Sequence, residues 1–153
     1  MVEYIARTFS GVETTSAMGY IFFFYGTDRR LPFATVAVTD NEFDSVSKLD
    51  REGVYRLNIG VDRETYRGLL GEEKPRLGPD GIVAGGHDFT ELDRILPHPV
   101  YAPQSWVAVL NPGRRTWNRV QELLAEAYER AVERENRADR SPGAEPDQGK
   151  GPS

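Results

Sequence analysis

The sequence predicts an α+β domain of two layers, with helices on one face of a mostly antiparallel sheet. Short apolar or alternating stretches recur between residues 12 and 110, as in strands, and residues 117–134 carry apolar side chains at helical spacing. With 153 residues, 39% of them hydrophobic, the chain has the length of one domain that can bury a core. We predict a single domain over residues 1–135 and a disordered polar tail at residues 136–153.

The first third of the chain predicts a helix and three strands. Apolar residues at helical spacing over residues 2–9 predict a short helix that lies against the sheet. Residues 12–17 form a weak strand. Residues 20–25 are aromatic or branched on both faces and form a strand that is covered on both sides. A polar loop of hairpin type, residues 26–32, leads to a returning strand at residues 33–39.

The strand at residues 54–59 is the one around which the other elements are predicted to assemble. Its side chains alternate between the two faces of the sheet. Tyr55, Leu57 and Ile59 face the core, while Val54, Arg56 and Asn58 face the other side. A guanidinium and a carboxamide therefore share one face, where they either contact water or bind a polar group.

The segments around this strand are predicted from turn and cap residues. The connection at residues 40–53 breaks the alternation and is expected to contain a short helical turn. Asp62 is expected to cap a helix over residues 63–70, which Gly71 ends. Residues 72–86 are rich in glycine and proline and lack a period, which is typical of a mobile loop or lid.

Three further elements complete the predicted fold. Asp88, with Glu91 three residues later, has the spacing of a capping box, so a turn of helix is expected through Leu92 and Ile95. Residues 106–110 form a buried strand. The terminal helix, from residue 117 to about 134, covers one sheet face together with the N-terminal helix, and a functional site is expected on the opposite face.

The composition excludes several classes of protein. The absence of cysteine excludes disulfides, thiolate nucleophiles and cysteine-based metal sites. No signal peptide and no apolar run of membrane-spanning length occurs, so we expect a cytoplasmic protein with no membrane partner. The net charge of −5 weighs against nucleic acid as a partner. The GxGxxG, Walker and GxSxG motifs do not occur, and we predict no cofactor.

His98 is the stronger of the two histidines as a candidate for proton transfer. Prolines on both sides restrict its backbone, and Tyr101 and Trp106 follow closely. A histidine titrates near neutrality and would act as a general acid or base, here with Tyr101 in support. The alternative is a histidine that hydrogen-bonds its own loop, since one histidine without a fixed partner is a weak indication of catalysis.

A metal site would need two histidines and a carboxylate. His87, Asp88, Asp93 and His98 lie within one short segment, but their spacing matches no established ligand pattern. We therefore predict that the protein holds no metal.

A ligand site is predicted around Arg56 and Asn58. Arginine offers a planar fork to a carboxylate or phosphate, and asparagine both donates and accepts hydrogen bonds. Thr35 would join them if the two strands pair in a suitable register. Tyr25 and Trp106 would add apolar walls, because ligand pockets combine apolar walls with a few convergent polar groups.

Two alternatives to this ligand site remain open. In the first, Arg56 lies on an exposed sheet face and pairs with Asp44 or Asp50. In the second, the phenylalanines at residues 22–24 form core or a homodimer interface rather than a binding surface, and the protein is a structural dimer.

Several segments resemble one protein family. They are Phe33-Ala-Thr, Leu49-Asp-Arg, Arg56-Leu-Asn-Ile-Gly, Pro97-His-Pro-Val-Tyr and residues 106–112. As a set they resemble DUF6194, an uncharacterised family of mainly actinobacterial proteins, over residues 1–134. The Trp106 strand and a terminal helix with Tyr128 are also similar to the MmcQ/YjbR-like proteins, small α/β domains with a frataxin-like layout.

The MmcQ/YjbR resemblance implies two different functions. It suggests DNA binding through a double-wing motif, for which the two loops here carry only Arg29-Arg30 and Arg114-Arg115 as basic pairs. It also suggests small molecules, because MmcQ is named after an antibiotic gene cluster. We predict a small-molecule-binding protein linked to secondary metabolism, with residues 72–86 as a lid. The alternatives are a DNA-binding protein and a tailoring enzyme that uses His98.

Overall fold

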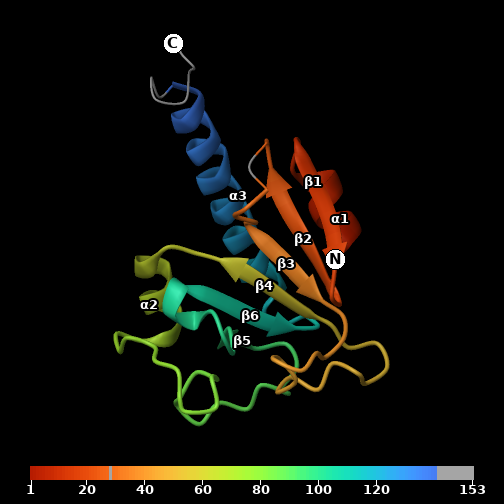
Figure 1. Ribbon diagram of the computed structural model, residues 1–153, viewed down its shortest axis with the longest axis vertical. Coiled ribbons are helices and arrows are strands. Elements are labelled where there is room, and N and C mark those ends of the chain that lie inside the picture. Colours follow the sequence, from red (N-terminus) through yellow and green to blue (C-terminus); the bar gives the residue numbers. More distant parts are fainter. Residues whose placement is uncertain (28, 141–153) are drawn as a thin grey trace.

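The computed structural model describes residues 1–27 and 29–140, which form one six-stranded sheet and three α-helices (Figure 1). The strands are β1 (Val12–Ala17), β2 (Tyr20–Tyr25), β3 (Ala34–Ala37), β4 (Arg56–Gly60), β5 (Ile95–Pro97) and β6 (Trp106–Leu110). The helices are α1 (Val2–Thr8), α2 (Arg63–Leu70) and α3 (Trp117–Arg140), with a short 3-10 helix, η1, at Ala102–Gln104. The strand order is β1-β2-β3-β4-β6-β5, and each neighbouring pair is antiparallel. The predicted α+β class with an antiparallel sheet is confirmed.

Helices α1 and α3 lie on the same face of the sheet, as the sequence predicts (Figure 1). The ring centroids of Tyr4 and Trp117 are 4.8 Å apart, and those of Phe9 and Tyr128 are also 4.8 Å apart. Alternate residues of the strands meet these helices in one apolar core. Its fully buried members include Ile5, Phe23, Leu57, Val107, Val120 and Leu124. Burial of this apolar surface is the main force that holds the two layers together.

Helix α2 begins and ends where its cap residues predict. The Asp62 side chain accepts a hydrogen bond from the Thr65 amide at 2.7 Å, and Gly71 ends the helix with a φ of 109°. The Thr65 hydroxyl donates to Glu126 of α3 at 2.7 Å, so α2 lies beside the terminal helix.

Helix α3 is longer than the sequence predicts. Its apolar stripe ends near residue 134, yet the helix continues to Arg140. The predicted disordered tail at residues 136–153 therefore begins inside a helix, and residues 141–153 lie outside the described part of the chain. No α-helix among the described residues is both long and apolar enough to cross a membrane.

Two local predictions are wrong. Residues 40–53 contain turns and no helical turn, because the Asp40 side chain accepts from the Leu49 amide at 2.9 Å and holds a non-helical loop. Asp88 does not begin a helix, since its side chain accepts from the amide and hydroxyl of Thr90, two residues on. Ile95, predicted to be helical, lies in β5.

Strand β5 was missed because it is short and ends in a proline. It pairs with β6 through Ile95 opposite Val109 and Pro97 opposite Val107, and it forms one edge of the sheet. An edge strand tolerates proline because one side of its backbone needs no partner strand.

Candidate functional site

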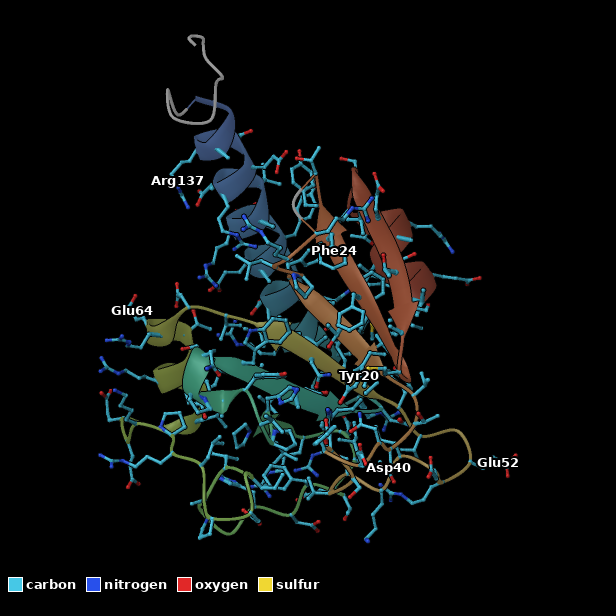
Figure 2. All side chains as sticks on the ribbon, viewed as in Figure 1. Tyr20, Phe24, Asp40, Glu52, Glu64 and Arg137 are labelled. Atoms are coloured by element: carbon cyan, nitrogen blue, oxygen red, sulfur yellow. The ribbon has the colours of Figure 1, made fainter. Side chains whose placement is uncertain are left out.

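A cavity of about 470 Å³ opens on the sheet face that lies away from α1 and α3. Its lining is mainly apolar. The residues that line it are Met18, Tyr20, Phe22, Arg30, Pro32, Thr35, Asn41, Phe43, Asp44, His98, Val100, Tyr101 and Trp106. Figure 2 shows Tyr20 near the end of the sheet where the connection that carries Asp40 passes. The cavity is therefore formed by the sheet and by the loops that fold over it.

The strand register brings distant residues to this face. Phe22 lies opposite Thr35, Thr35 opposite Asn58, and Asn58 opposite Ala108. Side chains of directly paired residues point to the same side of a sheet, so these four form a row across β2, β3, β4 and β6. Thr35 therefore pairs directly with Asn58, which is the condition under which the sequence predicted that it would join the ligand site.

Trp106 forms a wall of the cavity by lying over a glycine. A Cβ atom built on Gly60 would be 2.9 Å from Cε2 of the Trp106 indole, closer than a side chain tolerates. The glycine thus allows the indole to lie close against β4. The backbone amide of His98 donates to the Trp106 carbonyl at 3.0 Å, which places His98 next to this wall.

Arg56 lies beneath the cavity floor and is fully buried. Its guanidinium donates to both carboxylate oxygens of Asp44, at 3.0 and 2.5 Å, and to the Ser47 hydroxyl at 2.9 Å. Its Nε atom donates to the Asn58 carboxamide oxygen at 2.8 Å. The bidentate pair with Asp44 compensates the arginine charge, which would otherwise be costly to bury.

The network reaches the cavity at two points. Asn58 donates to the Thr35 hydroxyl at 2.9 Å, and Thr35 lines the cavity. At the other end Tyr20 donates to Asp44 at 2.6 Å and accepts from the Asn41 side chain at 3.2 Å. Burial and the neighbouring Asp44 carboxylate raise the pKa of Tyr20 to about 12. Burial opposes ionisation of Asp44, but the hydrogen bonds and charge of Arg56 outweigh it and lower the pKa of Asp44.

His98 is buried and held by its own loop. Its Nδ1 atom accepts hydrogen bonds from the amides of Val100 and Tyr101, each at 3.0 Å. Burial, and then the positive charge of Arg56, lower the pKa of His98 to about 3. The imidazole is therefore neutral at physiological pH, with its proton on Nε2. This geometry makes His98 better suited to donate a hydrogen bond than to act as a general acid or base.

The predicted site residues lie in three places: in the cavity lining, below the cavity floor, and on the helix side of the sheet. Thr35, His98, Tyr101 and Trp106 line the cavity. Arg56 and Asn58 lie below its floor, where Arg56 pairs with Asp44 in a buried network rather than on an exposed face.

Tyr25 is the exception, because it lies on the helix side of the sheet. Its ring centroid is 5.5 Å from that of Tyr128. It borders a different hollow of about 350 Å³ between the β2–β3 loop and α3. Tyr25 and Phe22 differ by an odd number of positions, so a strand points them to opposite faces.

Sequence reasoning missed the residues that the 40–53 connection brings to the cavity. Asn41 and Phe43 were interpreted only as part of a connection with a helical turn, and Asp44 was considered only as an ion-pair partner on an exposed face. One signal was available: Phe43 is a large apolar residue between turn residues. It is 73% exposed, as is Met18, and Tyr101 is 55% exposed. Exposed apolar residues clustered around one opening mark a binding surface more often than scattered ones do.

The two arginine pairs of the predicted wing loops lie at opposite ends of the strands. Arg29 and Arg30 follow the end of β2, whereas Arg114 and Arg115 follow the end of β6. The registers of β2, β3, β4 and β6 place the end of β2 on the same side as the start of β6, so the two arginine pairs lie at opposite ends of the strands. Arg29 also forms an ion pair with Glu13 and lies over the Phe24 ring, 5.8 Å from its centroid.

The four side chains considered as metal ligands have other hydrogen-bond partners or are exposed. Asp93 accepts from the amides of Gly113, Arg115 and Thr116, and His98 accepts from its loop. Asp88 closes the turn to Thr90, and His87 is exposed. In the described part of the chain, no three histidine or acidic side chains are grouped as metal ligands would be.

Comparison with known proteins gives a family and no activity. No curated protein and no solved structure matches the chain at a significant level. The similarity to MmcQ/YjbR-like proteins therefore stays a prediction. The family model DUF6194, described as a family of unknown function, matches residues 1–140. Because this match covers most of the chain, the protein belongs to the DUF6194 family.

Proposed function

We propose that the protein binds a small molecule in the cavity above Arg56 and Asn58. The observation that carries this proposal is a concavity of about 470 Å³ whose walls are largely aromatic and whose polar groups are few. Known small-molecule sites have this size and this combination of apolar walls and a few fixed polar groups.

The network beneath the floor supports binding because it holds the polar groups in place. Arg56 is anchored by Asp44, Ser47 and Asn58, and Asn58 in turn anchors Thr35. A site whose side chains are fixed before the ligand arrives loses less conformational entropy on binding. Arg56 and Asn58 thus position Thr35 and do not contact the ligand themselves.

The site favours binding over proton transfer. A general acid or base works best with a pKa near the working pH. The pKa of His98 is about 3, and its Nδ1 lone pair already accepts two loop amides. Tyr101, the predicted support, is half exposed at the rim, where its ring lies 5.0 Å from that of His98.

A thermal-shift screen of aromatic fragments tests the proposal. A fragment at ten times its Kd raises the melting temperature by roughly 3–6 °C, because it binds only the folded state. In Val100→Trp a larger side chain fills the cavity, and the shift should disappear.

The matched control is Val38→Trp, which adds the same side chain at a position that is 42% exposed and does not line the cavity. This variant should keep the full shift. A shift that survives in Val100→Trp, or a screen in which no aromatic fragment stabilises the wild type, would contradict the proposal.

A further inference from the structure

The direction of each hydrogen bond beneath the cavity is fixed by Arg56. An arginine side chain only donates, so the Asn58 atom that faces Nε, 2.8 Å away, must be the carboxamide oxygen. The amide nitrogen of Asn58 then faces Thr35 and donates to its hydroxyl oxygen at 2.9 Å. Thr35 is the acceptor in that bond, and its own hydrogen is left to point elsewhere.

The hydroxyl hydrogen of Thr35 can point into the cavity. The side chain is 7% exposed and lines the cavity, and no described residue other than Asn58 hydrogen-bonds its hydroxyl. A buried donor without a partner is costly, so a ligand acceptor at this point is favoured.

His98 supplies a second donor by the same reasoning. Two backbone amides point at Nδ1, so this nitrogen carries a lone pair and the proton of the neutral ring is on Nε2. His98 is 3% exposed, lines the cavity, and has no acceptor for Nε2 within the described residues.

The side-chain oxygens of Asp44, Tyr20 and Asn41, which border the cavity, already accept hydrogen bonds. Asp44, the one acidic side chain among the described residues of the lining, accepts two bonds from Arg56 and one from Tyr20. The Tyr20 oxygen accepts from Asn41. The floor therefore offers donors, and its charges cancel because Arg56 and Asp44 form a pair. Arg30 also lines the cavity, but it is exposed and its charge is screened by water.

From these observations we propose that the cavity selects uncharged aromatic ligands that carry a carbonyl or a similar acceptor. Thr35 Oγ1 and His98 Nε2 donate hydrogen bonds to the ligand, and Phe22 and Trp106 contact its aromatic body. An anion is disfavoured, since burying a carboxylate against a floor without net charge leaves that charge uncompensated. This inference rests on the proposed function and specifies the ligand class of the same site.

Three probes of the same shape test the inference. They are 2-acetylnaphthalene, which has a carbonyl, 2-isopropenylnaphthalene, in which a CH₂ group replaces the oxygen, and the anion 2-naphthoate. Trp106 lines the cavity and Trp117 is the second of the two tryptophans in the chain. In a Trp117→Phe background, quenching of Trp106 fluorescence therefore reports binding in the cavity.

We expect the ketone to bind about tenfold more tightly than the hydrocarbon and than 2-naphthoate, as the loss of one or two buried hydrogen bonds requires. Thr35→Val removes one of the two donors and should reduce the ketone preference to about threefold. Thr35→Ser keeps the hydroxyl and should retain the preference.

His98→Asn is the second variant, in case Thr35→Val does not fold. The asparagine oxygen can accept the loop amides in place of Nδ1, while the Nε2 donor is lost. It too should lower the ketone preference.

The possible outcomes separate this inference from the proposed function. Equal binding of ketone and hydrocarbon, or tightest binding of 2-naphthoate, would overturn the ligand class and leave a binding cavity in place. If none of the three probes quenches Trp106, or if the probes raise the melting temperature of Val100→Trp as much as that of the parent, the proposed function itself fails.

Discussion

The guanidinium of Arg56 donates to both carboxylate oxygens of Asp44, at 3.0 and 2.5 Å, and both side chains are buried. This pair joins the centre of the sheet to the connection between β3 and β4. It holds one wall of the cavity in position, because the same connection contributes Asn41 and Phe43 to the lining.

Asp44→Asn should strongly destabilise the protein. The substitution leaves the Arg56 charge buried without its counter-ion, which costs about 3–5 kcal/mol. Urea unfolding gives the change in the free energy of unfolding.

Asp50→Asn is the matched control, because Asp50 is exposed and accepts one bond from the Asp40 amide. The control should change stability by less than about 0.5 kcal/mol. Equal effects of the two variants would show that the buried pair has no special role.

His98 should make stability depend on pH between 6.5 and about 3. Burial lowers the pKa of His98 from 6.5 to about 3 in the folded state. Between these values the unfolded chain binds a proton that the folded chain does not, so stability is complete above pH 6.5 and falls as the pH is lowered. The expected loss between pH 6 and pH 5 is about 1 kcal/mol.

His98→Asn should abolish this part of the pH dependence when urea unfolding is measured at pH 7, 6 and 5. His87→Asn is the control, since His87 is exposed, and it should behave as the wild type does. A slope that persists in His98→Asn would mean that another group causes it.

Gly60→Ala should displace the Trp106 indole. The added Cβ would be 2.9 Å from Cε2 of Trp106, so the ring must move or the strands must separate. Overpacking of this kind costs roughly 1–3 kcal/mol. The movement should also change Trp106 fluorescence in a Trp117→Phe background and weaken binding of aromatic fragments.

Gly68→Ala is the matched substitution in α2, where a new Cβ meets nothing within 4 Å. Alanine favours the helical conformation more than glycine does, so this variant should be more stable by about 0.5–1 kcal/mol. If Gly60→Ala were as stable as the wild type, the close contact between Gly60 and Trp106 would not constrain the site.

The sequence predicted the elements whose signals are local. The alternation in residues 54–59 identified β4 and the two faces of the sheet, and Asp62 and Gly71 defined both ends of α2. Arg56 and Asn58 were correctly placed away from the helices. Each of these predictions depends on residues only a few positions apart.

The parts that were missed depend on contacts between distant residues. The partner of Arg56 is 12 residues away in a segment without a period, so the sequence offered Asp44 and Asp50 equally. The position of Arg56 below the floor, rather than in the cavity, follows from that pairing. Similarly, Ile95 became part of a strand because β6 provided a partner, and Asp88 formed a turn with Thr90 although its spacing to Glu91 fits a helix cap.

Asp93 shows a structural role that the sequence did not indicate. Its carboxylate accepts from the amides of Gly113, Arg115 and Thr116 and from the Thr116 hydroxyl, at 2.6–3.1 Å, immediately before α3. Burial opposes ionisation of Asp93, but these hydrogen bonds outweigh it and lower its pKa to about 2. The hydrogen bonds of this carboxylate therefore connect the start of the terminal helix to the segment before β5.

Asp93→Ala should release this attachment and destabilise the protein by roughly 2–3 kcal/mol, because several amides lose their acceptor at once. Its φ of 55° adds strain for alanine, whereas asparagine tolerates this conformation. Asp93→Asn keeps one acceptor oxygen and should cost about half as much. Hydrogen exchange should localise the effect, with the amides of residues 113–116 exchanging faster than those in the middle of α3. Uniform acceleration across α3 would instead mean that Asp93 stabilises the whole domain rather than this junction.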